Sequence, residues 1–455
     1  MRELPEGWAV CKMPEAVFFQ EGPGLRKYQY TESGIPFLNI RTIFNGRIHI
    51  DLCQFLSKNE VDEKYQHFLL NAGDIICSTS GTLGKTAIVQ SQDLPLLLNT
   101  SVMRFRSLDE KTAIQGYIHL YLKSDLFLSQ AKKASTGSAQ VNVGPSHLKE
   151  FEFPLPPLNE QKRIADRLDQ LLTRIDKTKA QLDRILPLLK RFRQSVLAAA
   201  TSGKLTEEWR EENFQTHGAF KLLPLNQVVQ EPMRNGRSVR DGNGIPVLRL
   251  SALKNGRIDW SYVKNGEWDG IDVNRFLVKE QDFLISRGNG SKDLVGRGAL
   301  VLNVKLEIAF PDTMIRIRPN ISQIQSRYLQ IVWDTQNIRH QIESSAKTSA
   351  GIWKISQNDL EKIIIPTPPI EEQQEIVRRV EALFAKADRI EAQYKNARQQ
   401  VDRLTPALLA KAFRGELVPQ DPNDEPASVL LERVKEARSV GQIKTVQRTK
   451  KKIKF

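Results

Sequence analysis

The chain has 455 residues, with 67 Lys and Arg against 53 Asp and Glu, and a formal net charge of +14 at pH 7. This length predicts two or more domains, and the basic excess favours nucleic acid over a membrane as partner, because no apolar run approaches the roughly 18 residues that span a bilayer. The N-terminal MRELPEGWAV lacks the pattern of a signal peptide, and three scattered cysteines predict neither a disulfide framework nor a zinc site. These features indicate a cytoplasmic protein that associates with nucleic acid.

Residues 1–154 are predicted to form an α/β domain. A helical pattern covers residues 118–133. Short apolar and β-branched runs, separated by turns rich in Gly, Asn and Ser, predict strands at residues 37–40, 74–77, 87–89 and 102–105.

An Asn-Gly pair at residues 45–46 follows the first of these strands. This dipeptide is a strong hairpin signal, and Arg41 and Arg47 lie on either side of it. We expect the two arginines to support the turn or to contact DNA phosphates, rather than to read bases.

The stretch STSGTLGKTAIV at residues 78–89 resembles the phosphate-binding loop of nucleotide hydrolases. That loop needs four residues between its first Gly and its Gly-Lys pair, and only two are present here. A DNA contact fits better, because glycine permits close approach, lysine meets phosphates, and hydroxyl side chains reach base edges. We predict that Ser80, Thr82 and Lys85 contact DNA; a glycine-rich turn without DNA contact is the alternative.

A polar, basic stretch at residues 132–140 comes before the end of this domain. Its candidate DNA contacts are Lys132, Lys133 and Ser138. The stretch either lines the DNA or is a solvated loop, and the sequence leaves both alternatives open.

Residues 155–205 are predicted to form a coiled-coil helix. Pro156 and Pro157 mark its start, and Pro187 is expected to kink it. Apolar residues recur in alternating steps of four and three, the 3.5-residue period of a coiled coil. These residues are Ile164, Leu168, Leu171, Ile175, Thr178, Leu182, Ile185, Leu189, Phe192 and Val196.

The whole unit then recurs. PPLNEQKRIADRLDQLL, from residue 156, returns as PPIEEQQEIVRRVEALF from residue 368, and IPFLNIRTIFNGRI, from residue 35, returns as IPVLRLSALKNGRI from residue 245. A second α/β domain is therefore predicted at residues 206–366, with a helical stretch at 326–344. A second coiled-coil helix is predicted at 367–417, where Pro406 is expected to introduce a kink. Two similar helices in one chain are expected to pair with each other.

The second domain carries counterparts of the candidate DNA contacts. Its loop, SRGNGSKDLVGRGALV from residue 286, has Gly-Arg-Gly in place of Gly-Lys-Thr and is longer, a change that a nucleotide site would not tolerate. The predicted contacts in this half are Arg249, Arg287, Asn289, Ser291, Lys292, Arg297, Lys347 and Lys354.

Residues 418–455 are predicted to form a C-terminal tail. A short helix is expected at 427–438. Beyond it, a basic end that finishes KKKIKF is expected to be disordered and to make weak, salt-sensitive DNA contacts.

These motifs together resemble one protein family. Long helices that open with PPLNEQ or PPIEEQ and end at SGKL or RGEL, with LPEGW near the N-terminus, are similar to the specificity subunit of type I restriction–modification enzymes. The resemblance implies two α/β target-recognition domains, each reading half of a split DNA sequence. It also implies an α+β fold in which two long antiparallel coiled-coil helices separate these domains, with a pseudo-two-fold internal repeat.

The same resemblance implies partners and places the chemistry in them. The helices would dock two modification subunits, which bind S-adenosylmethionine and methylate adenine N6. Two restriction subunits would use ATP and magnesium to cut DNA. This chain would bind no cofactor or metal and have no catalytic centre.

The residues agree that the chain is not a catalyst. No Asn/Asp-Pro-Pro-aromatic motif of amino-methyltransferases occurs, and six histidines are scattered along the chain. Two other functions stay open at this point: a stand-alone sequence-specific DNA-binding regulator and a structural coiled-coil adaptor.

Overall fold

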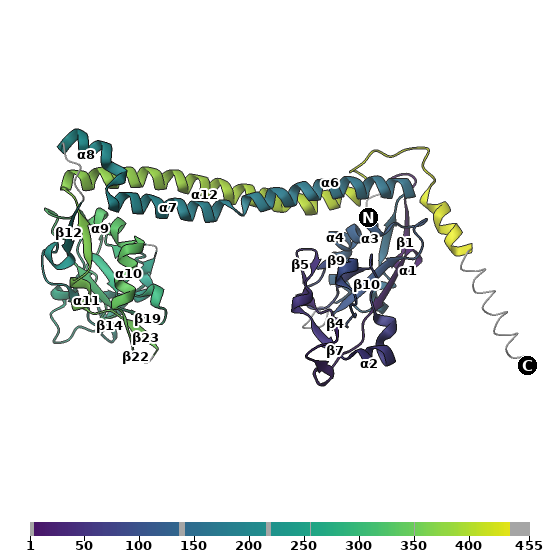
Figure 1. Ribbon diagram of the computed structural model, residues 1–455, viewed down its shortest axis with the longest axis horizontal. Helices are drawn as coiled ribbons and strands as arrows, with labels where there is room; N and C mark the ends of the chain where they lie inside the picture. The colour runs from purple at the N-terminus through teal and green to yellow at the C-terminus, as the bar shows by residue number, and fades with distance from the viewer. Residues whose placement is uncertain (1–3, 136–141, 215–219, 255, 350, 437–455) are drawn as a thin grey trace, which may run out of the picture. The chain divides into compact units, whose positions relative to one another are not determined.

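Figure 1 shows the computed structural model, which describes residues 4–135, 142–214, 220–254, 256–349 and 351–436. The chain divides into two compact units, one of Met1–Gln181 with Ala397–Phe455 and one of Leu182–Asn396. Each unit contains one α/β domain and parts of the long helices. Within the described ranges, no helix is long and apolar enough to cross a membrane.

The first unit is built on a four-stranded antiparallel sheet. In order across the sheet, its strands are β2 (Val17–Glu21), β10 (Val102–Ser107), β8 (Ile75–Ser78) and β9 (Thr86–Ile88). Helices α3 (Gln115–Leu122) and α4 (Asp125–Ala134) pack on it through Tyr117, Tyr121 and Phe127, which are buried. The predicted strands at 74–77, 87–89 and 102–105 are confirmed to within two residues.

Smaller elements complete this domain. The predicted strand at 37–40 is shorter and ends at Phe37. The smaller elements are α1 (Met13–Ala16), β3 (Tyr30–Thr31), β4 (Ile35–Phe37), β5 (Ile43–Phe44), β6 (Arg47–Ile48), β7 (Gln54–Leu56), α2 (Lys58–Glu60) and α5 (Pro145–Leu148).

The second unit repeats this arrangement, as the sequence predicted. Its six-stranded sheet has the order β13 (Arg234–Asn235), β21 (Met314–Ile317), β18 (Phe283–Ser286), β20 (Gly298–Leu300), β16 (Arg257–Ile258) and β15 (Leu253–Lys254). The first four strands follow the order of the first unit. Helices α9 (Ser326–Trp333) and α10 (Gln336–Ser345) occupy the places of α3 and α4, and Trp333 is buried in the core.

The helical stretches predicted at 118–133 and 326–344 are therefore confirmed, each as two helices. Ser124 lies between α3 and α4 and is the N-cap of α4, because its side chain accepts a hydrogen bond from the backbone N–H of Phe127. The remaining elements of the second unit are α8 (Glu207–Phe214), β14 (Asp241–Leu248), β17 (Val263–Gly266), β19 (Gly288–Asn289), β22 (Lys347–Ser349), β23 (Ile352–Lys354) and α11 (Gln357–Glu361).

A two-stranded pair joins the beginning of each domain to its end. In the first unit β1 (Ala9–Lys12) pairs with β11 (Glu152–Leu155), and in the second β12 (Lys221–Pro224) pairs with β24 (Ile364–Thr367). Each long helical segment starts directly after the second strand of its pair, so the sheet fixes where the helix begins.

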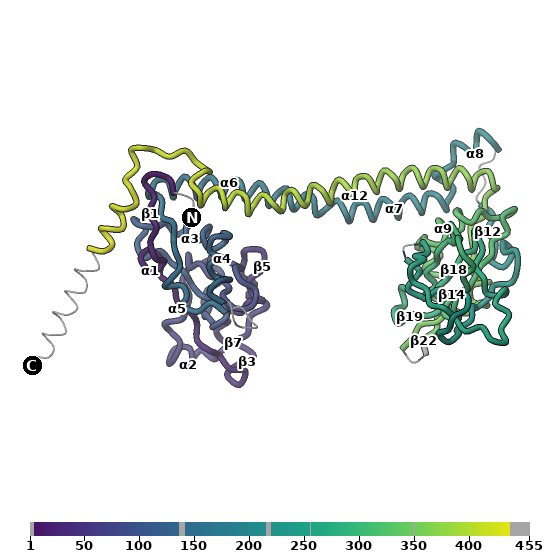
Figure 2. Tube along the Cα trace, turned by 180° about the vertical axis from the view of Figure 1, so that it is seen from behind, coloured from purple at the N-terminus to yellow at the C-terminus, as the bar shows by residue number. Residues whose placement is uncertain are grey.

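Three long helices follow the two domains: α6 (Leu158–Leu182), α7 (Ile185–Ser202) and α12 (Ile370–Ala412). In the first unit α6 lies beside the last part of α12, and in the second α7 lies beside its first part (Figure 2). The ion pairs Lys179–Asp402, at 3.0 Å, and Arg193–Asp388, at 2.6 Å, belong to these two pairings. Residue numbers rise along one helix as they fall along the other, so the predicted antiparallel pairing is confirmed.

The two prolines of the helices behave differently. The first helix is interrupted at residues 183–184, and Pro187 lies in the first turn of the new helix. A proline ring crowds the carbonyl four residues before it, here that of Asp183, which explains the position of the break. Pro406 lies inside α12, which continues without interruption.

The segment after α12 returns to the first domain. The backbone N–H of Ala427 donates to the carbonyl of Gly7 at 2.9 Å, and Arg163 of α6 pairs with Asp424 at 2.7 Å. Residues 427–436 are helical, as predicted. The predicted basic end, residues 438–455, lies outside the described residues.

Candidate nucleic-acid interface

A buried aspartate and two arginines support the central strand in each domain. In the first, Arg106 on β10 donates to Asp74, with 2.8 Å between Nη2 and Oδ2, and Arg104 lies 3.7 Å from the same carboxylate. In the second, Arg318 donates to Asp282, with 2.7 Å between Nε and Oδ1. These hydrogen bonds raise the pKa of Arg106 and Arg318 above the usual value.

Each aspartate also holds the turn that enters the strand. Asp74 Oδ2 accepts from the backbone N–H of Asn71 at 2.8 Å, and Asp282 Oδ2 accepts from that of Lys279 at 2.8 Å. The strands β8 and β18 are therefore fixed at their starts, and the loops predicted to contact DNA follow at their other ends.

The first loop is tightly wound. Ser78 Oγ donates to the carbonyl of Thr82 and accepts from the backbone N–H of Lys85 at 3.0 Å. Gly81 and Gly84 have φ of +65° and +78°, which other residues rarely adopt. The loop is closed by its own hydrogen bonds.

The path after this loop differs from that of a nucleotide-binding loop. The Gly-Lys-Thr triplet leads into strand β9, whereas a phosphate-binding loop leads into a helix. Thr86 is buried, and its Oγ1 lies 3.1 Å from Nε2 of His119. Burial lowers the pKa of His119 to about 4, so this imidazole is neutral at pH 7. Lys85 Nζ donates to the carbonyl of Ile40 at 3.4 Å.

The second loop is longer and forms part of a small sheet. Strand β19 pairs with β23, and β23 pairs with β22 in a hairpin. The backbone N–H of Ile355 donates to the carbonyl of Arg287 at 2.9 Å. Lys292 Nζ lies 4.9 Å from the centre of the Trp353 ring, and Trp353 packs against the core.

The structure brings the two predicted stretches together in the second domain, and in the first it joins the loop to residues just after the predicted basic stretch. In the second, Arg287, Asn289 and Lys292 lie with the hairpin that carries Lys347 and Lys354. In the first, Ser80 forms a bridge with Asn142, and the N–H of Val143 donates to the carbonyl of Thr79 at 2.9 Å.

The other predicted DNA contacts of the first domain lie in the loop and in helix α4. Thr82 is exposed in the loop, and Lys132 and Lys133 are exposed in the last turn of α4. Ser138 lies outside the described residues.

Three of the predicted arginines belong to turns beside the sheets. Arg41 is exposed in a short 3₁₀ turn, and Arg47 begins β6. Asn45 and Gly46 both have positive φ, +50° and +71°, as the predicted hairpin turn requires. Arg249 is exposed before another 3₁₀ turn. Their contact with DNA stays a prediction.

Two predicted residues of the second loop make local contacts. Arg297 is exposed, and its Nε donates to the carbonyl of Asp293 at 3.1 Å. The backbone N–H of Ser291 donates to Asn289 Oδ1 at 3.2 Å, an Asx turn that shapes the loop.

Sequence reasoning missed the residues that join the domains to the helices. Gln373 donates to the carbonyls of Gln323 and Pro368 and accepts from the N–H of Gln325 at 2.8 Å. Gln161 makes the same set, with Thr112, Pro156 and Ile114 as its partners. The sequence does contain a sign of these joints, because a Glu-Gln pair follows the two prolines closely in both copies.

The glutamates of these pairs differ between the two joints. Glu372 is buried and accepts from Arg210, with 2.8 Å between Nη2 and Oε1, and from Thr206 Oγ1 at 2.6 Å. Glu160 is also buried, but it accepts from Trp8 Nε1 at 3.0 Å through Oε2 only. Its Oε1 has no hydrogen-bond partner within the part of the chain that the structure describes. Burial raises the pKa of Glu160, and the Trp8 hydrogen bond opposes this.

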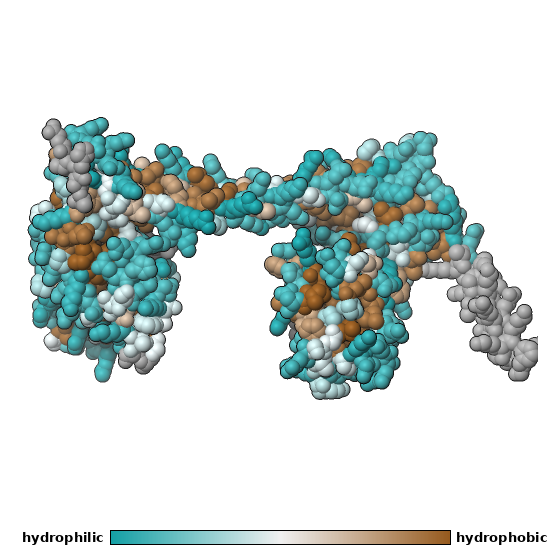
Figure 3. Space-filling model, in the orientation of Figure 1, coloured by the Kyte–Doolittle hydropathy of each residue, from teal (hydrophilic) through white to brown (hydrophobic). Residues whose placement is uncertain are grey.

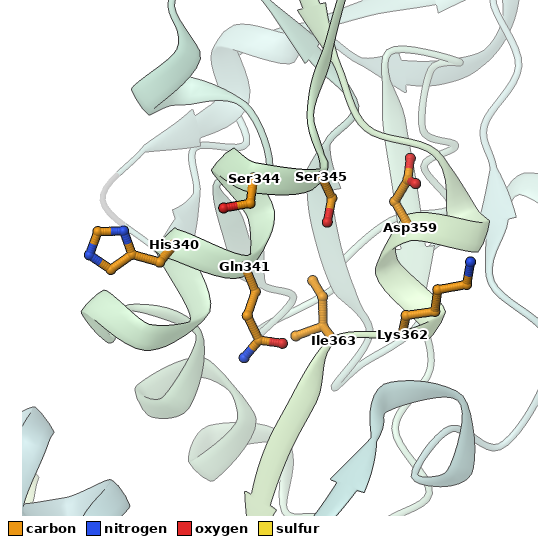
Figure 4. Close-up of a pocket in the computed structure, with 7 residues that line it drawn as sticks. All are labelled: His340, Gln341, Ser344, Ser345, Asp359, Lys362 and Ile363. Atoms are coloured by element: carbon orange, nitrogen blue, oxygen red, sulfur yellow. The ribbon is translucent and has the colours of Figure 1, made fainter.

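A pocket on the second domain is lined by several polar side chains, among them His340, Gln341 and Asp359 (Figure 4). Their hydrogen bonds indicate a structural role. Asp359 accepts from the N–H of Ser356 at 3.0 Å, and Gln341 exchanges hydrogen bonds with the backbone of Ile364. His340 points away from Asp359 in this view. The polar groups thus serve the local fold, and no cluster of three potential metal ligands occurs among the described residues.

Comparisons with known proteins agree with this architecture. The family model described as "Type I restriction modification DNA specificity domain" matches residues 5–186 and 227–398. The chain is 34% identical to the EcoKI specificity subunit of Escherichia coli K12, covering 98% of this chain and 99% of the relative. It is also 34% identical to the StySPI specificity subunit of Salmonella potsdam, with the same coverage.

Solved structures share the fold. The HsdS subunit from Thermoanaerobacter tengcongensis is 20% identical and has a TM-score of 0.57, covering 91% of this chain and 98% of that one. A chain from a study of the assembly and conformational transition of the type I R-M system is 19% identical and has a TM-score of 0.68, covering 92% of this chain and all of that one. Two matched specificity domains and full-length relatives identify this chain as a member of the type I restriction–modification specificity subunit family, whose members are non-catalytic.

Proposed function

We propose that this chain gives a type I restriction–modification complex its DNA specificity by reading a bipartite, asymmetric target. Each α/β domain reads one half-site, and the paired helices set the gap. The observation that carries this proposal is the meeting of loop and basic segment in the second domain, where Arg287, Lys292, Lys347 and Lys354 lie together. Such side chains supply the phosphate contacts and base-edge donors that duplex DNA requires.

The long helices are proposed to dock two modification subunits. In the second unit, side chains left exposed on the helices include Leu188, at 58%, and Ile390, at 45%. In the first unit, Leu404 is 46% exposed. Hydrophobic side chains gather on the surface of the helices (Figure 3). Further helices from partners would bury these side chains, as helical bundles do.

The catalytic steps and their cofactors are proposed to lie in the partners. The modification subunits would bind S-adenosylmethionine and methylate adenine N6, and two restriction subunits would use ATP and magnesium. The complex is proposed to work in the cytoplasm, where it meets DNA.

Methyladenine sequencing of cells tests the proposal. Cells that express the chain with its modification subunit should carry methyladenine in one split motif, and cells that lack the chain should carry none. A stand-alone regulator would leave the methylation unchanged, and a coiled-coil adaptor would produce no bipartite preference.

Partner docking has its own test. Leu188→Glu should weaken co-purification of the modification subunit by about tenfold or more, since it places a charge in an apolar interface. Gln194→Glu, on the same helix and also exposed, is the matched control. Equal co-purification of both variants would show that this surface docks no partner.

A further inference from the structure

The hairpin of β22 and β23 has two faces with different chemistry. In its register, Lys347 lies opposite Lys354, and Thr348 lies opposite Trp353. Opposite residues in antiparallel strands lie on the same face, and successive residues alternate between faces. Lys347, Ile352 and Lys354 therefore share one face, and Thr348 and Trp353 share the other.

The Trp353 face fixes the hairpin to the domain. Trp353 is partly buried against the core, with Lys292 over its ring. Strand β19 pairs with the edge of β23, and its Asn289, opposite Trp353, lies on the Trp353 face. The other face therefore points outward.

The outward face is exposed and carries positive charge. Lys347 and Lys354 are exposed, and Ile352 is 44% exposed. Like charges directly opposite each other destabilise a pair of strands unless an anion lies near them. Although burial opposes it, hydrogen bonds from Ser356 and, after them, the charge of Lys347 lower the pKa of Asp359, so one carboxylate lies near this pair, but neither lysine forms an ion pair with a described residue. A polyanion is the ligand that this pair favours.

Gly288 keeps this face open next to the strands. It lies opposite Lys354 in the register, and a Cβ atom there would lie 3.4 Å from Lys354 Cγ and 3.7 Å from Ile352 Cγ2. Without that atom, the Ile352 side chain borders an open surface. An exposed isoleucine beside two lysines fits an apolar group carried on a polyanion, and the thymine methyl group in the major groove of DNA is such a group.

We propose that the outward face of this hairpin enters the major groove at the second half-site. Ile352 contacts a thymine 5-methyl group, and Lys347 and Lys354 hold the neighbouring phosphates. The major groove admits a two-stranded ribbon, and β19 pairs with the hairpin only at Trp353 and Lys354, so β22 and β23 are two-stranded at Ile352. Trp353 is a positioning residue, since it acts by holding the hairpin. This inference rests on the proposed function and assigns the residue that reads one base.

A uracil scan of the second half-site tests the contact. Replacing thymine by uracil removes only the methyl group, and at one position it should weaken binding of the assembled complex about fourfold, the value of one buried methyl group. With Ile352→Ala the same replacement should change binding by less than about 1.5-fold, since the partner of the methyl group is gone. Ile321→Ala, at another exposed isoleucine of this domain, should keep the fourfold loss.

Substitution of a lysine should change the strength and salt dependence of binding instead of the base preference. Lys354→Gln should weaken binding to every duplex and reduce the log–log salt slope by roughly one, without changing base preference. A scan without any thymine-sensitive position in the wild type, or one that Ile352→Ala leaves unchanged, would overturn the inference. So would loss of the modification subunit from the Ile352→Ala complex, which would make this face a protein-docking surface. If the wild-type complex bound no split motif at all, the proposed function itself would fail.

Discussion

In the first domain the Ser80–Asn142 bridge and a hydrogen bond from the N–H of Val143 to the carbonyl of Thr79 join the loop after β8 to the segment that follows the basic stretch. In the second domain the corresponding loop forms β19 and joins a three-stranded sheet with β22 and β23. The supporting aspartate–arginine contacts and the glutamine at the helix joint are the same in both. Parts that hold the domain together are thus repeated, and parts predicted to meet DNA differ, as expected when two domains read different sequences.

The repeated support should be important in both domains. Asp74→Ala and Asp282→Ala should each destabilise their own domain by about 3–5 kcal/mol, because each removes a buried carboxylate that bonds an arginine and the turn entering the central strand. The loss should be nearer the lower end for Asp282→Ala, since Arg318 keeps Glu231 as a second partner at 2.8 Å. Hydrogen exchange of β8 and β18 would measure the two effects separately. Asp269→Ala, at an exposed aspartate of the second domain, is the control and should leave exchange unchanged. A large loss in one domain only would show that the two supports are not equivalent.

The two helix joints should respond unequally. Glu372→Gln should destabilise the second joint by about 3 kcal/mol, since Arg210 loses its charged partner in a buried site. Glu160→Gln should leave the first joint as stable as before, or more stable, because an amide removes a buried charge. Hydrogen exchange of β12 with β24, and of β1 with β11, would report on each joint. Equal losses would contradict the asymmetry.

The same pair predicts a pH dependence. The pKa of Glu160 is raised in the folded state, so its protonated form favours folding. Its contribution is present at low pH and is lost as the pH rises through the folded-state pKa. Thermal unfolding of the first unit should therefore lose some of its pH dependence above the usual glutamate pKa in Glu160→Gln, which resembles the protonated form. Superimposable pH profiles of variant and wild type would argue against a raised pKa.

The loop of the second domain should affect one half-site only. Arg287→Ala or Asn289→Ala should relax base preference there by about 1–3 kcal/mol, the value of a lost base-edge contact. Motif-resolved methylation by the assembled complex measures this preference. Relaxation of the other half-site would contradict the assignment of one domain to one half-site.

The smallest expected effect concerns the first loop. Lys85→Ala should weaken binding to all duplexes about equally and lower the log–log salt slope by roughly one, because a phosphate contact carries no base information. Salt titrations with matched and mismatched duplexes test this. A loss confined to the matched duplex would make Lys85 a base-reading residue.

The sequence predicted the repeat, the paired antiparallel helices and the order of the main strands, because apolar periodicity and long-range identity are both visible in it. It also identified the loops at Ser80 and Asn289. It did not predict that the hairpin at 347–354 adds to the second loop, since strand pairing between distant segments leaves no local pattern. The roles of Trp353 and Glu372 depend on partners far along the chain, so they emerged only from the fold.

Site-specific photo-crosslinking tests most directly whether each domain reads its own half-site. A photoreactive residue would replace Thr82 in the first domain or Ser291 in the second, both of which are exposed in the predicted DNA-contacting loops. The assembled complex would then be bound to a duplex that carries the methylated motif. If each domain reads its own half-site, crosslinks from residue 82 should lie in one half-site and those from residue 291 in the other. Crosslinks from both residues to the same half-site, or from neither to the motif, would contradict that assignment.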